Sequence, residues 1–181
     1  MISSPNIKIL SVFYGLSKNS FLILLKLINR ILYKGEIKVN KKDRRYFKIA
    51  KAISKLSKFD KYRVGSILVL KHDVISTGYN KFKTYPKQKL LNHHRFPDDD
   101  RFKGHIHSEL DCLKKIPEYV DLSNASLYIY RDNTHGIQMS RPCDACMEEI
   151  KRRKIKCIYY TDNDGYYKEI IKREDDNICQ L

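Results

Sequence analysis

The sequence lacks long apolar runs, internal repeats and tryptophan. A membrane-spanning helix needs roughly 18 consecutive apolar residues, and no stretch of this chain approaches that length, so we expect no transmembrane segment. Only Lys8 is basic before the apolar stretch 21–25, and no small-residue cleavage site follows it, so we expect no cleaved signal peptide. Without repeats or low-complexity tracts, the 181 residues predict one domain of ordinary size with an extension.

Acidic residues are scarce relative to basic ones, at 21 against 36, which gives a formal net charge of +15. Ten bases but only two acids precede residue 46, so more than half of the net charge lies early in the chain. A basic surface favours anionic partners, namely nucleotides, nucleic acid or acidic membranes. Compositional drift explains the charge equally well, because the abundance of Lys, Ile, Asn and Tyr is typical of an AT-rich genome.

Cysteine usage does not fit a disulfide framework. The number of cysteines is odd, and two of them form a Cys-x-x-Cys pair, which indicates a reducing compartment. We expect two of the others in the core, one on a predicted helix and one in a predicted strand. The metal-like pair is Cys143 and Cys146, the expected core residues are Cys112 and Cys157, and Cys179 lies near the end of the sequence.

Residues 1–40 are predicted to form a basic, partly helical N-terminal extension, and residues 41–181 the folded domain. Ser20 is a candidate cap for a helix that ends near Gly35. Packing of this helix on the domain or on a partner subunit is the main expectation, and attachment to a membrane surface is the alternative.

Helices and strands are expected to alternate through the domain, which predicts an α/β sandwich. Helical spacing and β-branched runs mark the elements. Helices are expected from Asp43, over 107–115, from Pro142 and over 167–173, and strands over 64–70, 74–80, 125–130 and 155–160.

Residues 81–104 form a long polar segment without periodicity, which we expect to be a loop that walls the site. Its aromatic residues, Phe82, Tyr85 and Phe96, either anchor the loop or provide a stacking platform for bases, and anchoring is the preferred interpretation. His93 and His94, close to Asp98, Asp99 and Asp100, are a candidate second metal site, although exposed loop residues are the simpler interpretation.

The residues that carry chemistry lie in two short motifs, His107-Ser108-Glu109 and Pro142-Cys143-Asp144-Ala145-Cys146. One imidazole and two thiolates give zinc three protein ligands and leave a fourth position open for water, which is the pattern of a catalytic site. Glu109 then serves as a base and acid beside that water and not as a ligand. Two residues three apart at the start of a helix face the same way, where free N–H groups favour thiolates.

Three other interpretations of these motifs remain open. The Cys-x-x-Cys pair alone is also typical of a redox dithiol, and a structural zinc site would take its fourth ligand from His93, His94 or His105. A non-enzymatic zinc-stabilised binding module is disfavoured, since a purely structural site has no use for Glu109.

These motifs, with Val64–Val69 and Ser76–Asn80 before them, resemble the cytidine and deoxycytidylate deaminase superfamily over residues 43–172. The stretch Asn80–Pro86, together with the turns Ser140–Cys143 and Tyr159–Asp162, resembles a branch often met in phages and large viruses.

The resemblance implies a three-layer α/β/α fold with a mixed five-stranded sheet flanked by helices, and a homo-oligomer. It also implies zinc held by His107, Cys143 and Cys146, with Glu109 as the catalytic proton shuttle. Asn80 matches the asparagine that touches the sugar in relatives, and Ser140 lies where the base pocket is lined. Ser108 replaces the alanine that is common at its position, and because both side chains are small we expect the site to tolerate the change.

The activity that follows is hydrolytic deamination of a cytosine-type base, giving the uracil analogue and ammonia. A free (deoxy)cytidine nucleotide such as dCMP is the first choice of substrate, because the basic loop would bind its phosphate. The alternative is a tRNA or single-stranded DNA deaminase, with the basic surface binding the polymer. The cytoplasm, of the host if the source is viral, is the expected location.

Overall fold

The computed structural model describes residues 40–59, 61–95 and 104–171. The expected N-terminal extension, Cys179, Phe96 and the aspartates of the candidate second metal site lie outside these ranges. None of the helices within them combines the length and apolar character of a membrane span.

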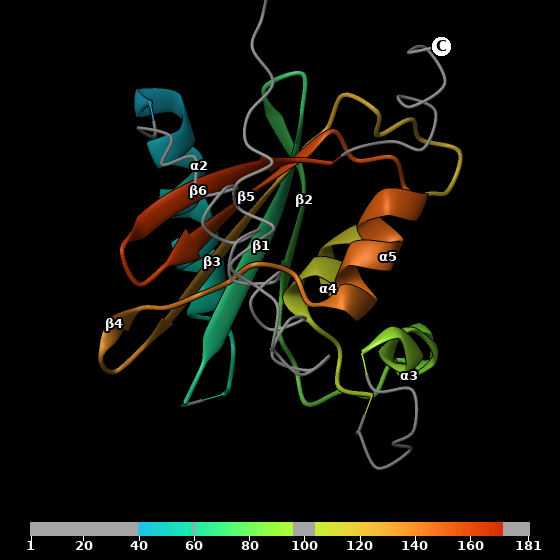
Figure 1. Ribbon diagram of the computed structural model, residues 1–181, viewed down its shortest axis with the longest axis horizontal. Helices are drawn as coiled ribbons and strands as arrows, with labels where there is room; N and C mark the ends of the chain where they lie inside the picture. The colour runs from blue at the N-terminus through green and yellow to red at the C-terminus, as the bar shows by residue number, and fades with distance from the viewer. Residues whose placement is uncertain (1–39, 60, 96–103, 172–181) are drawn as a thin grey trace, which may run out of the picture. The chain divides into compact units, whose positions relative to one another are not determined.

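A mixed β-sheet forms the middle of the fold, with its strands in the order β2-β1-β3-β5-β6 (Figure 1). Neighbouring strands on this path are antiparallel except β3 and β5, which are parallel and are joined through a helix. The two-residue strand β4 pairs with β3 outside the five-strand path. The strands are β1 (Arg63–Leu70), β2 (Asp73–Tyr79), β3 (Ser126–Asn133), β4 (Gly136–Ile137), β5 (Cys157–Asp162) and β6 (Gly165–Ile170).

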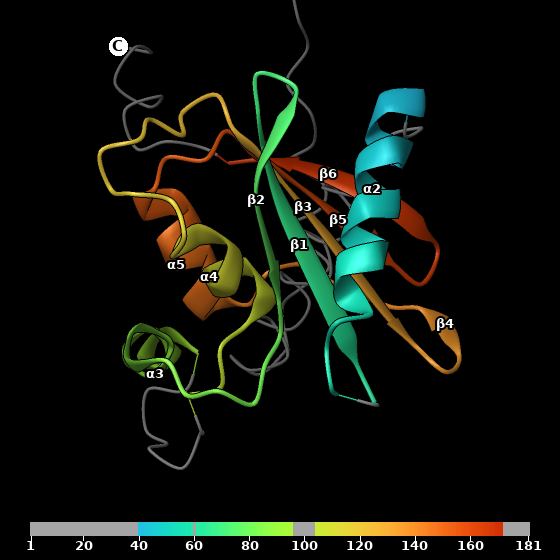
Figure 2. The same cartoon turned by 180° about the vertical axis from the view of Figure 1, so that it is seen from behind.

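Helices cover both faces of the sheet (Figures 1 and 2). Helix α2 (Lys41–Ser54) packs on one face, while α4 (Ser108–Leu113) and α5 (Asp144–Arg152) lie on the other. Helix α3 (Pro86–Leu91) and the 3₁₀ turn η2 (Asn92–His94) follow β2 and lie beside α5. The expected three-layer α/β/α architecture is therefore confirmed.

Side chains of the central strands alternate between two cores, as the period of a strand requires. Ile67 and Tyr128 pack with α2, whereas Leu68 and Leu127 pack with the α4 and α5 layer. Because both faces are buried, β1 and β3 are nearly continuous apolar runs and are easy to recognise in the sequence. Cys112 and Cys157 are buried in or beside these cores, as expected.

Two glycines let the outer layers approach the sheet closely. A Cβ at Gly65 would collide with the backbone of α2 at Ala50, and a Cβ at Gly78 would collide with the backbone of α4 at Ser108 and Cys112. The position of α4, and of the residues at its start, therefore depends on the absence of a side chain in β2.

Three local predictions were wrong. The helix expected over 167–173 is instead the edge strand β6, because the turn ending at Gly165 (φ +148°) folds the chain back along β5. Helix α2 begins at Lys41 and not at Asp43. Its cap is Asn40, whose side chain accepts a hydrogen bond from the Asp43 amide at 2.8 Å. Residues 86–94 are helical and do not form an irregular loop, since Pro86 begins α3 at the position where proline is favoured.

Candidate active site

The starts of α4 and α5 bring together the three expected metal ligands. His107 is the N-cap of α4 and Cys143 the N-cap of α5, with Cys146 one turn later. Their ligand atoms all lie within 4.8 Å of one another. The His107 Nδ1 atom is 3.5 Å from Cys143 Sγ and 3.4 Å from Cys146 Sγ.

This geometry fits zinc. Bonds of about 2.3 Å to sulfur and about 2.0 Å to nitrogen, meeting at a tetrahedral angle, place the two ligand atoms roughly 3.5 Å apart. Within the described residues, these three form the one group of His, Cys, Asp or Glu side chains close enough to hold a metal ion. His105 packs against Phe59 and Phe82, and no fourth side chain of the described ranges joins the group.

The two thiols of the cluster hold their protons unequally. A hydrogen bond from Cys146 lowers the pKa of the Cys143 thiol to about 4, with a further contribution from His107. The same hydrogen bond, together with burial, raises the pKa of Cys146 well above its ordinary value. The pair therefore holds one thiolate and one proton, and that proton leaves when a cation takes its place.

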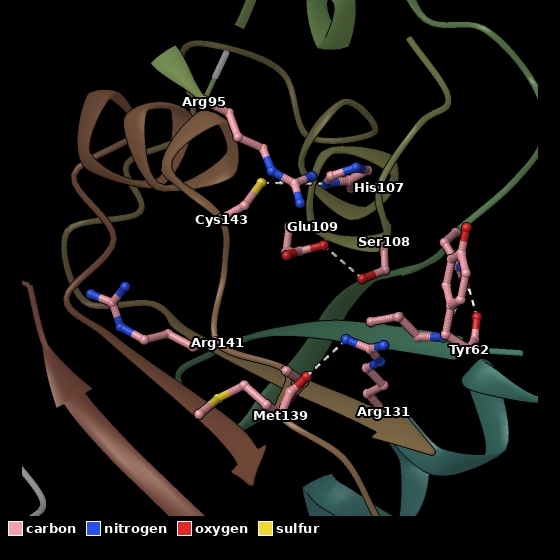
Figure 3. A pocket seen from close by; sticks show the side chains of 12 residues that line it. Tyr62, Arg95, His107, Ser108, Glu109, Arg131, Met139, Arg141 and Cys143 are labelled. Atoms are coloured by element: carbon pink, nitrogen blue, oxygen red, sulfur yellow. Dashed lines mark hydrogen bonds between the residues drawn. The ribbon is translucent and has the colours of Figure 1, made fainter. Parts of the chain in front are cut away.

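Glu109 follows His107 by two residues and lies beside the cluster in the same pocket (Figure 3). Its side chain is buried, and burial raises the pKa of the carboxyl above its ordinary value. Ser66 of β1 donates a hydrogen bond to Ser108 Oγ (2.7 Å), which donates to Glu109 Oε2 (2.8 Å). The two serines are fully buried, so they hold one carboxylate oxygen of Glu109 in place.

The segment after β2 also supports the site, and its Arg95 lines the pocket. The buried side chain of Gln88 accepts a hydrogen bond from the His107 amide at 3.0 Å. Lys87 forms an ion pair of 2.8 Å with the buried Glu149 of α5. Helix α3 is thus bound both to the first metal ligand and to the helix that carries the other two. Sequence analysis did not single out Gln88, and a glutamine in a polar segment offers no signal for this role.

A pocket of about 360 Å³ opens beside the cluster. It is within the size range of small-molecule sites. Besides the metal ligands and Glu109, three arginines line it, together with a tyrosine from the segment before β1. The residues not proposed as site residues from the sequence are Tyr62, Val64, Arg95, Ser108, Arg131, Met139 and Arg141.

Asn80 and Ser140 both line this pocket, but hydrogen bonds to the backbone already occupy their polar atoms. Asn80 accepts from the Val64 amide at 2.9 Å and donates to Tyr62 O at 3.1 Å. Ser140 Oγ donates to Ile129 O at 2.9 Å and accepts from the Thr161 amide at 2.8 Å. Both residues hold the pocket wall together, and their contact with a substrate stays a prediction.

The aromatic residues of the 81–104 segment anchor it. Phe82 stacks on Phe59 with ring centroids 3.8 Å apart, and Tyr85 packs in the apolar cluster around Ile106 and Leu110. Phe82 nevertheless keeps 56% of its surface exposed. Tyr85 therefore anchors the segment as expected, whereas Phe82 does so with only part of its surface.

The sequence matches one family model, described as the cytidine and deoxycytidylate deaminase zinc-binding region, over residues 40–162. Among curated proteins, it is 24% identical over 125 residues to a probable deoxycytidylate deaminase of Caenorhabditis elegans. The match covers 68% of this chain but only 58% of the length of that relative.

Solved structures resemble the fold. Cytidine deaminase from Burkholderia pseudomallei aligns with a TM-score of 0.50 and 13% identity, covering 70% of this chain and 91% of that one. The dCMP deaminase of cyanophage S-TIM5, solved in complex with dCMP and dUMP, aligns with a TM-score of 0.46 and 23% identity, covering 70% and 82%. The family model spans more than half of the chain and includes all three clustered metal ligands, so the protein belongs to the cytidine and deoxycytidylate deaminase family.

Proposed function

We propose that this protein is a zinc-dependent enzyme that hydrolyses the amino group of a cytosine nucleotide, with dCMP as the first candidate. One observation carries the proposal: a three-ligand metal cluster stands beside a buried carboxylate in a pocket large enough for a small molecule. A structural metal site would need neither the pocket nor Glu109.

Each group has a role in that reaction. His107, Cys143 and Cys146 would hold zinc, which supplies a water of lowered pKa when bound. Glu109 accepts a proton from the water, while a C–O bond forms at the amino-bearing carbon of the ring. Glu109 gives that proton to the adjacent ring nitrogen. The remaining proton of the added hydroxyl then passes through Glu109 to the amino group, as the C–N bond breaks and the C=O bond forms. Water is consumed, and ammonia and the uracil analogue are released.

Two observations favour a free nucleotide. The curated relative is named a probable deoxycytidylate deaminase. The pocket is lined by Arg95, Arg131 and Arg141, and guanidinium groups are well suited to a phosphate. The homo-oligomer, the cytoplasmic location and the division of the chain near residue 40 stay predictions.

Ammonia release from zinc-loaded protein tests the proposal, with dCMP, dCTP, cytidine and deoxycytidine as substrates. We expect turnover of a nucleotide, and a loss of about 10²- to 10⁴-fold in Glu109→Gln, the usual contribution of a general acid–base group. Glu148→Gln, which removes a carboxylate on α5 that pairs with Lys151, is the matched control and retains activity. Full activity of Glu109→Gln, or no turnover of any compound, contradicts the proposal.

A polynucleotide substrate is the second candidate. Phe82, Phe59 and Tyr62 form a continuous stack, with Phe59 and Tyr62 centroids 5.0 Å apart, and Tyr62 borders the pocket. Exposed aromatic rings near lysines suit the bases of a single strand. Turnover of single-stranded DNA or tRNA, with no turnover of any free nucleotide, would favour this candidate.

A further inference from the structure

Two of the three arginines that line the pocket, Arg131 and Arg141, differ in what balances their charge. Arg141 is bound by both oxygens of Glu169, at 2.7 and 2.8 Å. Arg131 donates only to a backbone oxygen, that of Met139, at 3.3 Å. Within the described ranges, Arg131 makes no ion pair, and its buried Nε atom has no hydrogen-bond partner.

Among the residues that the structure describes, no carboxylate compensates for Arg131. Its sequence neighbour Asp132 lies on the opposite face of β3, as alternation requires, and pairs with Arg63 at 3.6 Å. The one acid that lines the pocket is Glu109, which accepts from Ser108. A half-buried guanidinium without a counter-charge costs free energy, and an anionic ligand in the pocket would remove that cost.

The position of Arg131 suits the far end of a substrate. In Figure 3, its guanidinium lies on the opposite side of the pocket from His107 and Cys143, with Glu109 and Ser108 between them. The Arg131 Cζ atom is 5.6 Å from the centre of the Tyr62 ring, which limits the directions in which the guanidinium can turn. A ligand whose ring lies at Glu109 would extend its other end toward Arg131.

We propose that Arg131, oriented by Tyr62 and Met139 O, forms an anion subsite for the phosphate monoester of the substrate nucleotide. This inference rests on the proposed function. A guanidinium presents several N–H donors in one plane and matches two phosphate oxygens at once, so it recognises a phosphate more strongly than a hydroxyl. The subsite therefore makes the pocket select a nucleotide over a nucleoside.

Binding of reaction products tests the subsite without turnover. Calorimetric titration of zinc-loaded protein with dUMP and with deoxyuridine measures the preference for the phosphate. We expect dUMP to bind roughly 10- to 100-fold more tightly, as charged hydrogen bonds allow. Arg131→Gln should abolish that preference and leave deoxyuridine binding unchanged, while Arg131→Lys retains part of it.

A control variant and a second ligand show whether the effect is specific to Arg131 and to a phosphate monoester. Arg45→Gln removes an equal charge from α2, on the other side of the sheet, and should keep the full preference for dUMP. A dinucleotide with an internal phosphodiester should bind Arg131→Gln as well as it binds the wild type. If only the dinucleotide loses affinity in Arg131→Gln, the monoester subsite is overturned in favour of a polymer.

The outcomes separate this inference from the proposed function. Turnover of dCMP with an undiminished preference for dUMP in Arg131→Gln overturns the subsite and leaves the function standing. Binding of dUMP that depends on Arg131, without deamination of any cytosine nucleotide, keeps the subsite and overturns the function. If no cytosine nucleotide is deaminated and the binding of dUMP does not depend on Arg131, both the subsite and the proposed function are overturned.

Discussion

The two sides of the pocket are built in different ways. On one side, the starts of α4 and α5 supply His107, Glu109, Cys143 and Cys146 from two short motifs. On the other side, residues before β1, after β2 and along β3 meet only through tertiary contacts, and they include Tyr62, Asn80 and Arg131. The helix side carries reactive atoms, and the strand side gives the pocket its shape and charge.

This difference shows in what the polar atoms are bonded to. On the helix side, the His107 ring, the Cys143 thiol and the Glu109 carboxylate line the pocket side by side. On the strand side, Asn80 and Ser140 satisfy backbone groups that would otherwise be buried without partners. Damage to the helix side should therefore affect catalysis, while damage to the strand side should affect stability or binding. Four changes test this division, from the largest expected effect to the smallest.

Gly78→Ala and Gly65→Ala form a matched pair on the two faces of the sheet. Each added Cβ collides with the backbone of a helix, so each should lower the free energy of unfolding by about 3 kcal/mol or more, as severe overpacking does. Only Gly78→Ala displaces α4 and with it Glu109. Urea unfolding measures the stability, and activity per folded molecule should fall in Gly78→Ala alone. Equal losses of activity per folded molecule in both variants would show that the position of α4 does not determine the activity.

Asn80→Ala removes both hydrogen bonds that join the start of β1 to the end of β2. The Val64 amide and Tyr62 carbonyl lose their partners, so we expect a destabilisation of about 1–3 kcal/mol. Thermal unfolding with and without dUMP separates the two roles of this residue. If stability is unchanged and only dUMP affinity falls, Asn80 is a substrate contact and not a structural one.

Ser108→Ala removes the hydroxyl that holds Glu109 Oε2 and that accepts the hydrogen bond from Ser66. We expect kcat to fall about tenfold, equivalent to about 1.4 kcal/mol, with KM and zinc content unchanged. Ser108→Thr keeps the hydroxyl and is the control, although its extra methyl must fit a fully buried site. An unaltered kcat in Ser108→Ala would mean that Glu109 needs no support from this side chain.

Asp111 provides a pH-dependent test on the buried side of α4. Burial alone would raise the pKa of its carboxyl, but hydrogen bonds from Lys81 (2.7 Å) and Lys114 (2.9 Å) bring the pKa below its ordinary value. The stabilisation is therefore complete above the unfolded-state pKa of about 3.9 and is lost as the pH falls through the lower folded-state pKa. Urea unfolding from pH 6 to pH 2.5 should show a shallower acid loss for Asp111→Asn than for the wild type. Parallel curves would contradict this assignment.

The helix side of the pocket was predictable from the sequence because its residues lie two or three positions apart. The spacing of His107 and Glu109, and of Cys143 and Cys146, places each pair at one helix start whatever the rest of the fold does. The family resemblance added Asn80 and Ser140, which do line the pocket. Gln88 and Arg131 were not predictable, since their roles arise from contacts over 19 residues and from the lack of an acidic partner, respectively.

The same reasoning explains the secondary-structure errors. Central strands β1 and β3 are apolar on both faces and were recognised. Strand β6 is an edge strand with Tyr167 buried and Ile170 exposed, so its apolar residues do not alternate regularly and were mistaken for a helix. The short helix α3 is held by Gln88 and Lys87 through contacts to other elements, and its own sequence shows little periodicity.

The connection from β3 to α5 has a consequence for how substrate choice can change. Met139, Ser140 and Arg141 lie on this stretch, and Arg131 lies near the end of β3 just before it; the stretch includes the short strand β4 and ends at Cys143. Beyond Asp132, its only ladder pairing is the two-residue contact of β4 with β3. Substitutions at these four positions would change the pocket wall and leave the starts of α4 and α5 in place. Selectivity and chemistry can therefore diverge separately within one fold.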